Sequence, residues 1–286
     1  MALLTAKQIS AAAIGLLTRE LVLPMTVVRI NGGEFAGSNG DTVTVRVPQP
    51  GTALEQATPG ETITYDDITE VGVDVSLAHL YHAKRVTDEE LSLDVVDFGA
   101  QITAVQVAAV ATGAENQLAA AMNGLSVDES IALNGSDVSA KILKARAALG
   151  GENVPASDRY LAVSPDVATF LLEEDKFVKV NESGSDNALR NAVMGRLFGF
   201  TVVESNALDA GTAVAYHRTG FAMANRVPLA PRGAADSAVA SAGGIGLRQI
   251  FQYDPSRLSD ASVVSTFAGA AVVDADRVYK LDTSTT

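Results

Sequence analysis

The 286-residue chain contains no cysteine and no tryptophan, and aromatic residues make up only 5% of a sequence that is 47% hydrophobic. The absence of cysteine excludes disulfides, thiolate catalysis and zinc–thiolate sites. No run approaches the ~18 apolar residues of a membrane-spanning helix. Lys7 and Gln8 interrupt the Ala-rich segment 1–20 where a signal peptide would need its apolar run. We therefore expect a short amphipathic helix there, in a soluble protein made in the cytoplasm.

Basic residues are also scarce, because 21 Lys and Arg stand against 34 Asp and Glu and give a formal net charge of −13. The longest basic run is the pair Lys84-Arg85. Neutralising phosphates requires clustered cations, so this composition argues against a nucleic-acid-binding surface. A chain of this length can bury about three-quarters of its surface, in one large domain or two modest ones.

Valine alternates with polar residues in two segments, 41–47 and 71–78. This period of two predicts two half-buried strands. The segment between them, 48–69, is rich in Pro, Gly, Thr and acidic residues and is far too long for a tight turn. Long insertions with few core residues are usually functional. We therefore expect an arm that reaches a neighbouring molecule, which favours assembly over catalysis.

Four carboxylates on this arm are candidates for contacts between subunits, and two arginines are candidate partners on the adjacent subunit. A pair of neighbouring carboxylates could instead serve an active site, but on an exposed polar arm such a pair is more often a solvated face. The six candidate contact residues are Glu55, Glu61, Asp66, Asp67, Arg190 and Arg196.

The sequence 87–90, Thr-Asp-Glu-Glu, is a capping box that predicts a helix start at Thr87. Apolar residues then follow at spacings of four and three, which predicts a helix with one apolar stripe. We expect the main rod to run from near Asp94 to Ala121, roughly 42 Å at ~1.5 Å per residue. The alternative is an ordinary core helix of an α/β domain. The residues of the stripe are Leu91, Val95, Phe98, Ile102, Val105 and Ala109.

Beyond Asn123-Gly124 the pattern is that of an α/β module with late strands. Gly150-Gly151 is expected to end one helix, and Ser164-Pro165 to cap and open the next. Gly199 is expected to need a conformation, or a close approach, that a Cβ would hinder, and Phe200 to lie in the core. We expect helices at 139–149 and 164–172, a turn or helix at 188–194, and an Ala/Gly/Ser-rich connector at 237–246. The expected strands are 159–163, 201–203, 213–217, 220–224, 247–253, 263–273 and 277–281.

Signals of catalysis are weak throughout the sequence. His79 and His82 lie three apart on a predicted strand, so they point to opposite faces, which disfavours a shared metal. The segment 243–246, Gly-Gly-Ile-Gly, lacks the Lys-Ser/Thr of a phosphate loop, and no serine lies in a nucleophile elbow. We expect no enzyme, no metal and no cofactor, although an α/β enzyme with unrecognised motifs remains a third alternative.

The chain resembles major capsid proteins of tailed bacteriophages, and in particular the coat proteins that assemble with a separate scaffold. The segment 195–208 is similar to a Gly-Phe…Ser-Asn stretch that recurs in those proteins. Val163-Ser164-Pro165, earlier in the chain, is similar to the segment that those proteins carry at that position. Further similar segments follow in the same order over nearly the whole chain. They are 40–48, 75–79, 87–91, 96–98, 246–248, 253–254 and 269–274.

The resemblance implies an α+β protein with the Hong Kong 97-type capsid fold. It implies an N-terminal arm (1–40), an extended β-hairpin loop (41–86), a spine helix of a peripheral domain (87–123), an axial domain (124–235) and return strands of the peripheral domain (236–286), whose last strand could rejoin the axial domain. No long charged N-terminal extension is present, which suggests a separate scaffolding protein.

Two functional classes follow from the resemblance. The first is a major capsid protein, a virion component that self-assembles as hexamers and pentamers into an icosahedral shell around double-stranded DNA, with a scaffolding protein, a portal and a decoration protein as expected partners. It would be made in the host bacterial cytoplasm and would bind neither membrane nor specific DNA sequences. The alternative is an encapsulin-like nanocompartment that holds cargo enzymes.

Overall fold

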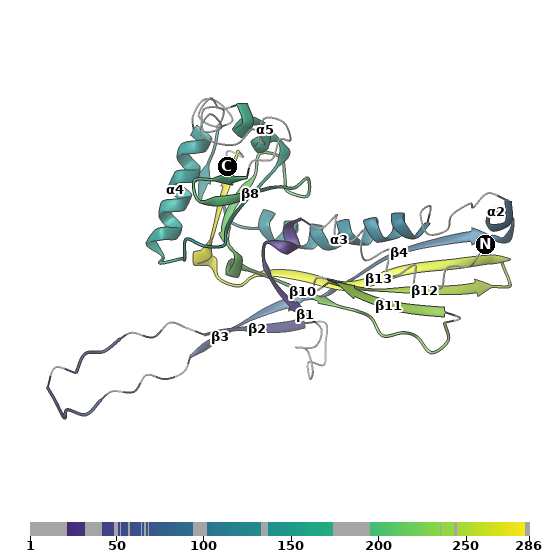
Figure 1. Cartoon of the computed structure of the whole chain (residues 1–286), viewed down its shortest axis with the longest axis horizontal. Helices are drawn as coiled ribbons and strands as arrows, with labels where there is room; N and C mark the ends of the chain where they lie inside the picture. Colours follow the sequence, from purple (N-terminus) through teal and green to yellow (C-terminus); the bar gives the residue numbers. More distant parts are fainter. Residues whose placement is uncertain are drawn as a thin grey trace.

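The computed structural model describes residues 22–31, 42–48, 51, 53–56, 58–63, 65, 67, 69–93, 102–132, 137–173, 195–234, 236–242 and 245–283. The features predicted for residues 1–20 and 188–194 lie outside these ranges. Within these ranges the protein has a mixed α+β fold with few helices and many strands, arranged as two six-stranded sheets and one two-stranded hairpin. Figure 1 shows an elongated molecule in which the hairpin projects from one side.

The first sheet is built around one long strand, β13 (Ser259–Val272). One edge of β13 pairs with β12 (Ile245–Asp254) and then with β10 (Phe221–Arg226), both antiparallel. The other edge pairs antiparallel with β4 (Ala78–Thr87). The outer strands are β1 (Val28–Asn31), parallel to β10, and β11 (Asp236–Ala242), antiparallel to β12.

Strand β11 corrects the expectation of a connector at 237–246. Alanine and serine have weak strand preferences, but those preferences depend strongly on context. Here the segment pairs with β12 along its full length, from Asp236 opposite Phe251 to Ala242 opposite Ile245. Ala238 is buried whereas Val239 is 53% exposed, as a half-buried strand requires. Pairing with a neighbouring strand outweighs composition at this site.

Helix α3 (Ala104–Asn123) lies along one face of the first sheet (Figure 1). Its alanine-rich sequence favours a helix, and its inward side chains, such as Val107 and Val110, pack against Leu247 and Val264. Gln106 is fully buried, and its amide donates to the carbonyl oxygens of His82 (3.2 Å) and Ser262 (2.8 Å).

The predicted rod agrees with the structure in part. The capping box starts a helix as predicted, α2 (Asp88–Leu93). Residues 94–101 lie outside the described ranges, so the start of the rod near Asp94 stays a prediction, and α3 ends at Asn123, two residues beyond the predicted Ala121. The predicted apolar stripe is buried at Ile102 but is wrong further along α3, because Val105 is 47% exposed and Ala109 is exposed. Leu91 is exposed too, and Val95 and Phe98 lie outside the described residues. In a helix this rich in alanine, several faces are apolar enough to be buried, and the sheet decides which one is.

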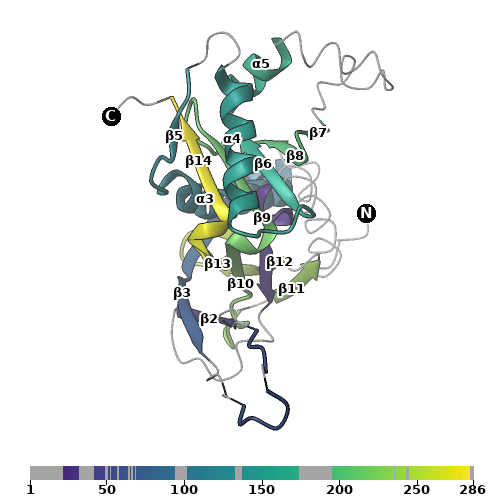
Figure 2. The ribbon, with the colours of Figure 1, turned by 90° about the vertical axis from the view of Figure 1, so that its left-hand side faces the viewer.

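The second sheet has the order β5 (Glu129–Ser130), β14 (Val278–Asp282), β9 (Ala213–His217), β6 (Arg159–Val163), β8 (Phe200–Glu204) and β7 (Arg196–Leu197). Helices α4 (Asp137–Gly151) and α5 (Pro165–Glu173) cover one face with a core that includes Ile142, Leu161 and Phe200 (Figure 2). Its other face packs against the C-terminal half of α3 and against the first sheet through Tyr216 and Phe221.

Two helix ends differ in detail from the expectation. Helix α4 includes Gly150 and Gly151, and it ends where Asn153 takes a left-handed conformation (φ 56°). Val154 N then bonds to Leu149 O (3.1 Å) and Asn153 N to Gly150 O (3.2 Å), the bond pattern of a Schellman end. Ser164 precedes α5 as predicted, but its buried hydroxyl makes no hydrogen bond among the described residues.

The hairpin consists of β2 (Thr42–Pro48) and β3 (Glu70–Ser76), which pair antiparallel with Val43 opposite Val75 and Val45 opposite Val73. The predicted strands and their valine face are thus confirmed. Among the described residues there are also three 3-10 turns: η1 (Leu23–Met25), η5 (Arg218–Gly220) and η6 (Ala275–Arg277). Leu23 and Val27, on either side of the end of η1, fill a gap between the two sheets and α3.

Candidate assembly interface

The base of the hairpin is anchored on the first sheet. Val43 and Val75 pack on Ala224 of β10, with Ile30 and Ala271 beside them. The chain passes from β3 into β4 directly over Gly269, where an added Cβ would lie 1.9 Å from Ser76 O. The hairpin base is therefore a fixed part of the subunit core, attached on the sheet face opposite α3.

The outer part of the hairpin has no such support. Every described residue from 51 to 69 is exposed, including Leu54 (68%) and Tyr65 (83%). Within these residues, one main-chain hydrogen bond is present, from Glu61 N to Thr58 O (3.2 Å), at a turn where Gly60 has φ 87°. Exposed apolar side chains beside unpaired backbone are typical of a surface that becomes covered on binding.

The predicted contact residues lie apart within one subunit. Glu55, Glu61 and Asp67 are exposed on the outer hairpin, and Arg196 is exposed on the edge strand β7 of the second sheet. Asp66 and Arg190 lie outside the described residues. No ion pair joins the three described carboxylates to Arg196 within the part of the chain that the structure describes. Their proposed pairing across two subunits therefore stays a prediction.

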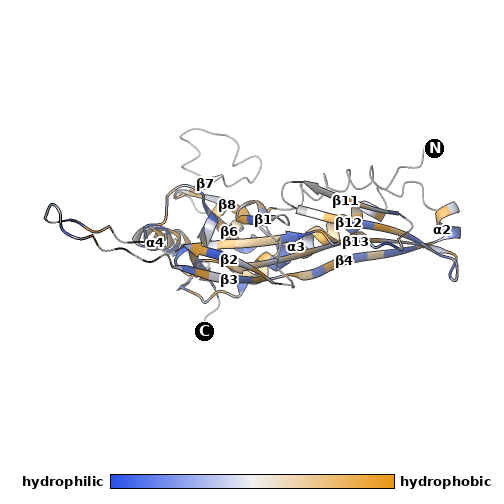
Figure 3. Ribbon diagram, turned by 90° about the horizontal axis from the view of Figure 1, so that it is seen from below, coloured by the Kyte–Doolittle hydropathy of each residue, from blue (hydrophilic) through white to orange (hydrophobic). Residues whose placement is uncertain are grey.

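A second surface, which the sequence did not single out, lies on the face of the first sheet opposite α3. Side chains on β4 alternate between the α3 side, where Leu80 lies 3.5 Å from the position of a Cβ on Gly113, and this opposite face. Figure 3 shows hydrophilic and hydrophobic residues alternating along β4. The opposite face carries what we call the basic patch, which comprises His79, Tyr81, Arg85, Arg226 and Arg248.

Cross-strand register brings the patch together, because residues directly opposite in antiparallel strands share a face. Phe267 of β13 lies opposite both His79 and Arg226, and its ring centroid is 4.6 Å from that of His79. His79 and His82 thus point to opposite faces, as predicted. Tyr81 is 68% exposed, and Arg85 and Arg226 are exposed as well.

Arg248 is the partly buried member of the patch. Its guanidinium donates to Ser265 Oγ (3.1 Å) and to the backbone oxygen of Leu229, and burial lowers its pKa. On the patch face, the one acidic side chain of the described strands β4, β10, β11, β12 and β13 is Asp254, at the end of β12, and it pairs with Arg257. In a chain with net charge −13, this face is locally positive.

The described residues hold no group of three or more His, Cys, Asp or Glu side chains placed to share a metal ion. None of the helices within the described ranges combines the length and hydropathy of a membrane span.

The fold is similar to that of solved phage capsid structures. A solved structure from Mycobacterium phage Che8 superposes with a TM-score of 0.67 at 21% identity, covering 93% of this chain and 92% of that one. The capsid structure of cyanophage P-SCSP1u gives 0.67 at 14% identity with 93% and 89% coverage. The mature capsid of bacteriophage PhiM1 gives 0.62 at 13% identity with 92% and 86% coverage. These likenesses establish the fold.

The sequence family follows from a direct match. The family model described as "Phage capsid protein" matches residues 61–281, which is more than half of the chain, so the protein belongs to this family. The search of curated proteins found no match. The protein is thus a major capsid protein, a structural subunit that self-assembles into the icosahedral shell of a bacteriophage virion, and the encapsulin alternative is not favoured.

Proposed function

We propose that this subunit assembles in the manner of the Hong Kong 97-type shells, with the β2–β3 hairpin lying across an adjacent subunit. The observation that carries the proposal is the contrast between the hairpin base, which is buried on Ala224, and the outer hairpin, whose described residues are all exposed. A projecting segment with Leu54, Ile63 and Tyr65 in water gains stability only when a neighbour covers it.

The surface that best suits the hairpin of a neighbour is the basic patch. The outer hairpin carries Glu55, Glu61 and Asp67, which complement Arg85 and Arg226 in charge, and Tyr81 offers an exposed ring to the apolar side chains. Arg196 and Arg190, the partners proposed from sequence, remain candidates in the second sheet and in the segment before it. Arg196 lies on a two-residue edge strand, and among the described residues no exposed aromatic side chain lies beside it. The basic patch is therefore the better binding surface for the hairpin of a neighbour.

The energy of each such contact is small. Exposed ion pairs contribute only ~0.2–1 kcal/mol each, and they weaken further as salt screens them. A shell repeats the contact at every copy, so weak pairs become decisive for closure while each subunit can still dissociate and correct errors. Assembly by this route should therefore be sensitive to ionic strength.

The remaining assignments extend this proposal. The second sheet with α4 and α5 would form the axial domain, for which the sequence suggested 124–235 and a possible last strand. That domain would include β14 (Val278–Asp282) and would exclude β10, which would belong with α3, as the spine helix, and the first sheet to the peripheral domain. The subunits would form hexamers and pentamers around double-stranded DNA with help from a scaffolding protein, a portal and a decoration protein. The role is structural, without catalysis, and subunits would be made in the host cytoplasm.

Deletion of the arm tests the proposal. Replacing residues 50–68 with a short Gly-Ser turn should leave a soluble subunit with near-native circular dichroism, because those residues contribute nothing to the described cores. Sedimentation should then show free subunits or aberrant oligomers and no closed shells. Normal shells from this deletion would place the assembly contacts elsewhere.

Removing the charge of the basic patch tests separately whether this patch binds the hairpin of a neighbour. The double variant Arg85→Gln and Arg226→Gln should fold normally and assemble poorly, whereas Lys144→Gln, which removes a 61% exposed cation on α4, should assemble as the wild type does. Equal assembly of both variants would exclude the patch while leaving the hairpin proposal standing.

A further inference from the structure

The chain passes between the two sheets three times, and two of these connections lie side by side. Turn η5 leads from β9 to β10, and η6 leads from β13 through residues 273–277 to β14. Val273 N donates to Gly220 O (2.8 Å), and a Cβ on Gly220 would lie 2.8 Å from Val278 Cγ1 and 3.0 Å from Arg277 O. The two connections are therefore packed backbone against backbone.

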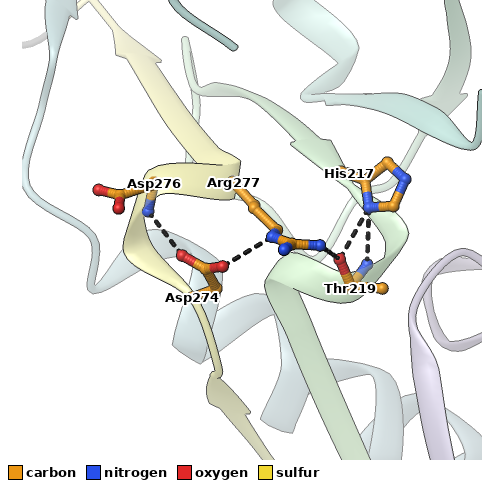
Figure 4. A network of polar contacts seen from close by, with 5 residues as sticks. All are labelled: His217, Thr219, Asp274, Asp276 and Arg277. Carbon is orange, nitrogen blue, oxygen red and sulfur yellow. Dashed lines mark hydrogen bonds and ion pairs between the residues drawn. The ribbon is translucent and has the colours of Figure 1, made fainter. Parts of the chain in front are cut away.

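A continuous chain of polar contacts crosses from one connection to the other (Figure 4). Asp274 accepts from Arg277 Nε (2.6 Å), and Arg277 Nη1 donates to Thr219 Oγ1 (2.7 Å). Thr219 Oγ1 lies 2.8 Å from His217 Nδ1, which also accepts from Thr219 N (3.3 Å) and so caps η5. This series of polar contacts joins the end of β9 to the start of β14 through both turns.

This geometry requires a neutral imidazole. Nδ1 can accept the Thr219 amide only if it carries no proton, so the remaining proton lies on Nε2. His217 is 7% exposed and is the last residue of β9, directly opposite Arg159 of β6. Burial and the nearby cations Arg277 and Arg159 lower the pKa of His217, while Asp158 acts in the opposite direction. The other charged residues of the connections are Arg218, Asp274 and Asp276.

We propose that His217, Thr219, Arg277 and Asp274 form an acid-sensitive latch that holds the two sheets of the subunit in one relative orientation. When the His217 ring is neutral, these contacts hold the two connections together. A proton on Nδ1 removes the acceptor of the Thr219 amide and places a second cation beside Arg277, so the connections separate and the sheets gain freedom to rotate. This inference concerns motion within one subunit and does not rest on the proposed hairpin contact.

The sign follows from the direction of the shift. Because the pKa of His217 is lower in the folded protein than its ordinary value of 6.5, the closed latch is favoured at neutral pH. That stabilisation is lost as the pH falls through the lowered pKa. Acidification through this lowered pKa, which lies below 6.5, therefore opens the latch, and neutral solution closes it.

The test uses the full chain, in which the absence of cysteine permits clean labelling. Spin labels at Gln252→Cys on β12 and Leu143→Cys on α4, both exposed, report the distance between the two sheets. At about pH 7.5 we expect one narrow distance distribution, and as the pH falls to about 4.5, through the lowered pKa of His217, a distribution at least about twofold broader. An unchanged distribution at the lower pH overturns the proposal.

His217→Asn is the decisive variant, since an asparagine oxygen can still cap η5 but does not titrate. It should keep the narrow distribution at both pH values, whereas His79→Asn, on the exposed face of β4, should broaden as the wild type does. Equal acid broadening in His217→Asn assigns the effect to other groups and overturns the latch.

A measurement on the wild type alone keeps the inference falsifiable if the variant fails to fold. Hydrogen exchange, corrected for intrinsic rates, should show several-fold lower protection of the Thr219 and Val273 amides in acid, with little change at Leu161 and Ala215 inside the second sheet. Equal loss across both groups, or no loss, contradicts a local latch.

Discussion

Single backbone positions decide where the elements of this subunit end and cross. Gly199 has φ 91°, and a Cβ there would meet Arg146 at an ordinary 3.8 Å, so the glycine is needed for its conformation and not for space. The next residue, Phe200, is fully buried, as the sequence predicted. Gly269 is instead needed for space: its φ is not positive, but Ser76 fills the position that a Cβ would take.

Gly269 provides a test of that distinction. Gly269→Ala would place a Cβ 1.9 Å from Ser76 O, which is backbone and cannot rotate away. We expect a loss of more than about 3 kcal/mol in the free energy of unfolding, at or beyond the upper end of ordinary overpacking, measured by urea denaturation.

Gly113→Ala is the matched control for this substitution. Its Cβ would meet Leu80 at 3.5 Å, an ordinary contact, inside a helix that gains up to ~1 kcal/mol from alanine. Unchanged stability in Gly269→Ala would mean that the hairpin base does not cross β13 as described.

At the scale of whole elements, the helices of the first sheet depend on different forces. Helix α2 is short and is held by its capping box, in which Glu90 N bonds to Thr87 Oγ1 (3.3 Å) and Thr87 N bonds to Glu90 Oε2 (2.9 Å). Its start is also tied to the sheet, since Asp88 N donates to Leu258 O (3.0 Å) and Asp88 Oδ2 accepts from Tyr253 Oη (2.9 Å). Helix α3 shows no side-chain cap among its described residues, and its buried face packs on the sheet.

The cap predicts an acid-sensitive α2. Hydrogen bonds from the backbone and side chain of Thr87 lower the pKa of Glu90 from 4.5, so the cap contributes above that value and is lost as the pH falls through the lowered pKa. We expect protection of the α2 amides to fall in acid, and Thr87→Ala to lower it about fivefold already at neutral pH, as measured by hydrogen exchange.

Two glutamate variants separate the cap from general acid effects. Glu90→Gln keeps an acceptor oxygen and should abolish the pH dependence, whereas Glu89→Gln, at an exposed position, should leave it intact. Acid sensitivity that persists in Glu90→Gln would assign the effect to another group.

At the scale of the whole molecule, the subunit combines well-packed cores with a projecting hairpin that has almost none. The core between α4, α5 and the second sheet and the core between the two sheets each contain many fully buried side chains, whereas the hairpin shares one small cluster at its base. Local stability follows the density of such contacts, so the subunit should open first at the hairpin.

Hydrogen exchange on free and assembled protein checks this ranking. In the free subunit, amides of residues 51–69 should exchange nearly as fast as unfolded chain, and those of β6 and β9 should be the slowest, since both strands lie inside the second sheet. In assembled shells the 51–69 amides should slow by at least about tenfold, as expected for a covered segment. High protection of 51–69 in free subunits would contradict the unsupported arm.

The sequence alone predicted the hairpin, the capping box and most strands of the second half. Through the order of its motifs, it also predicted the capsid family. These features are local, because alternation along β2 and β3 or a hydroxyl three residues before a carboxylate depends only on neighbours in the chain. The coarse function followed because the set of such local features, taken in order, is specific to one family.

The tertiary structure alone decided the rest. Nothing local distinguishes the buried Val107 from the exposed Val105 in an alanine-rich helix, or a strand from a linker in β11, because the choice depends on which partner covers each face. The basic patch and the latch likewise join residues that are far apart in the chain, such as Arg85 with Arg226 and Thr219 with Arg277. Such groupings arise from strand register and chain crossings, which are set by the sum of long-range contacts and leave no periodic trace in the sequence.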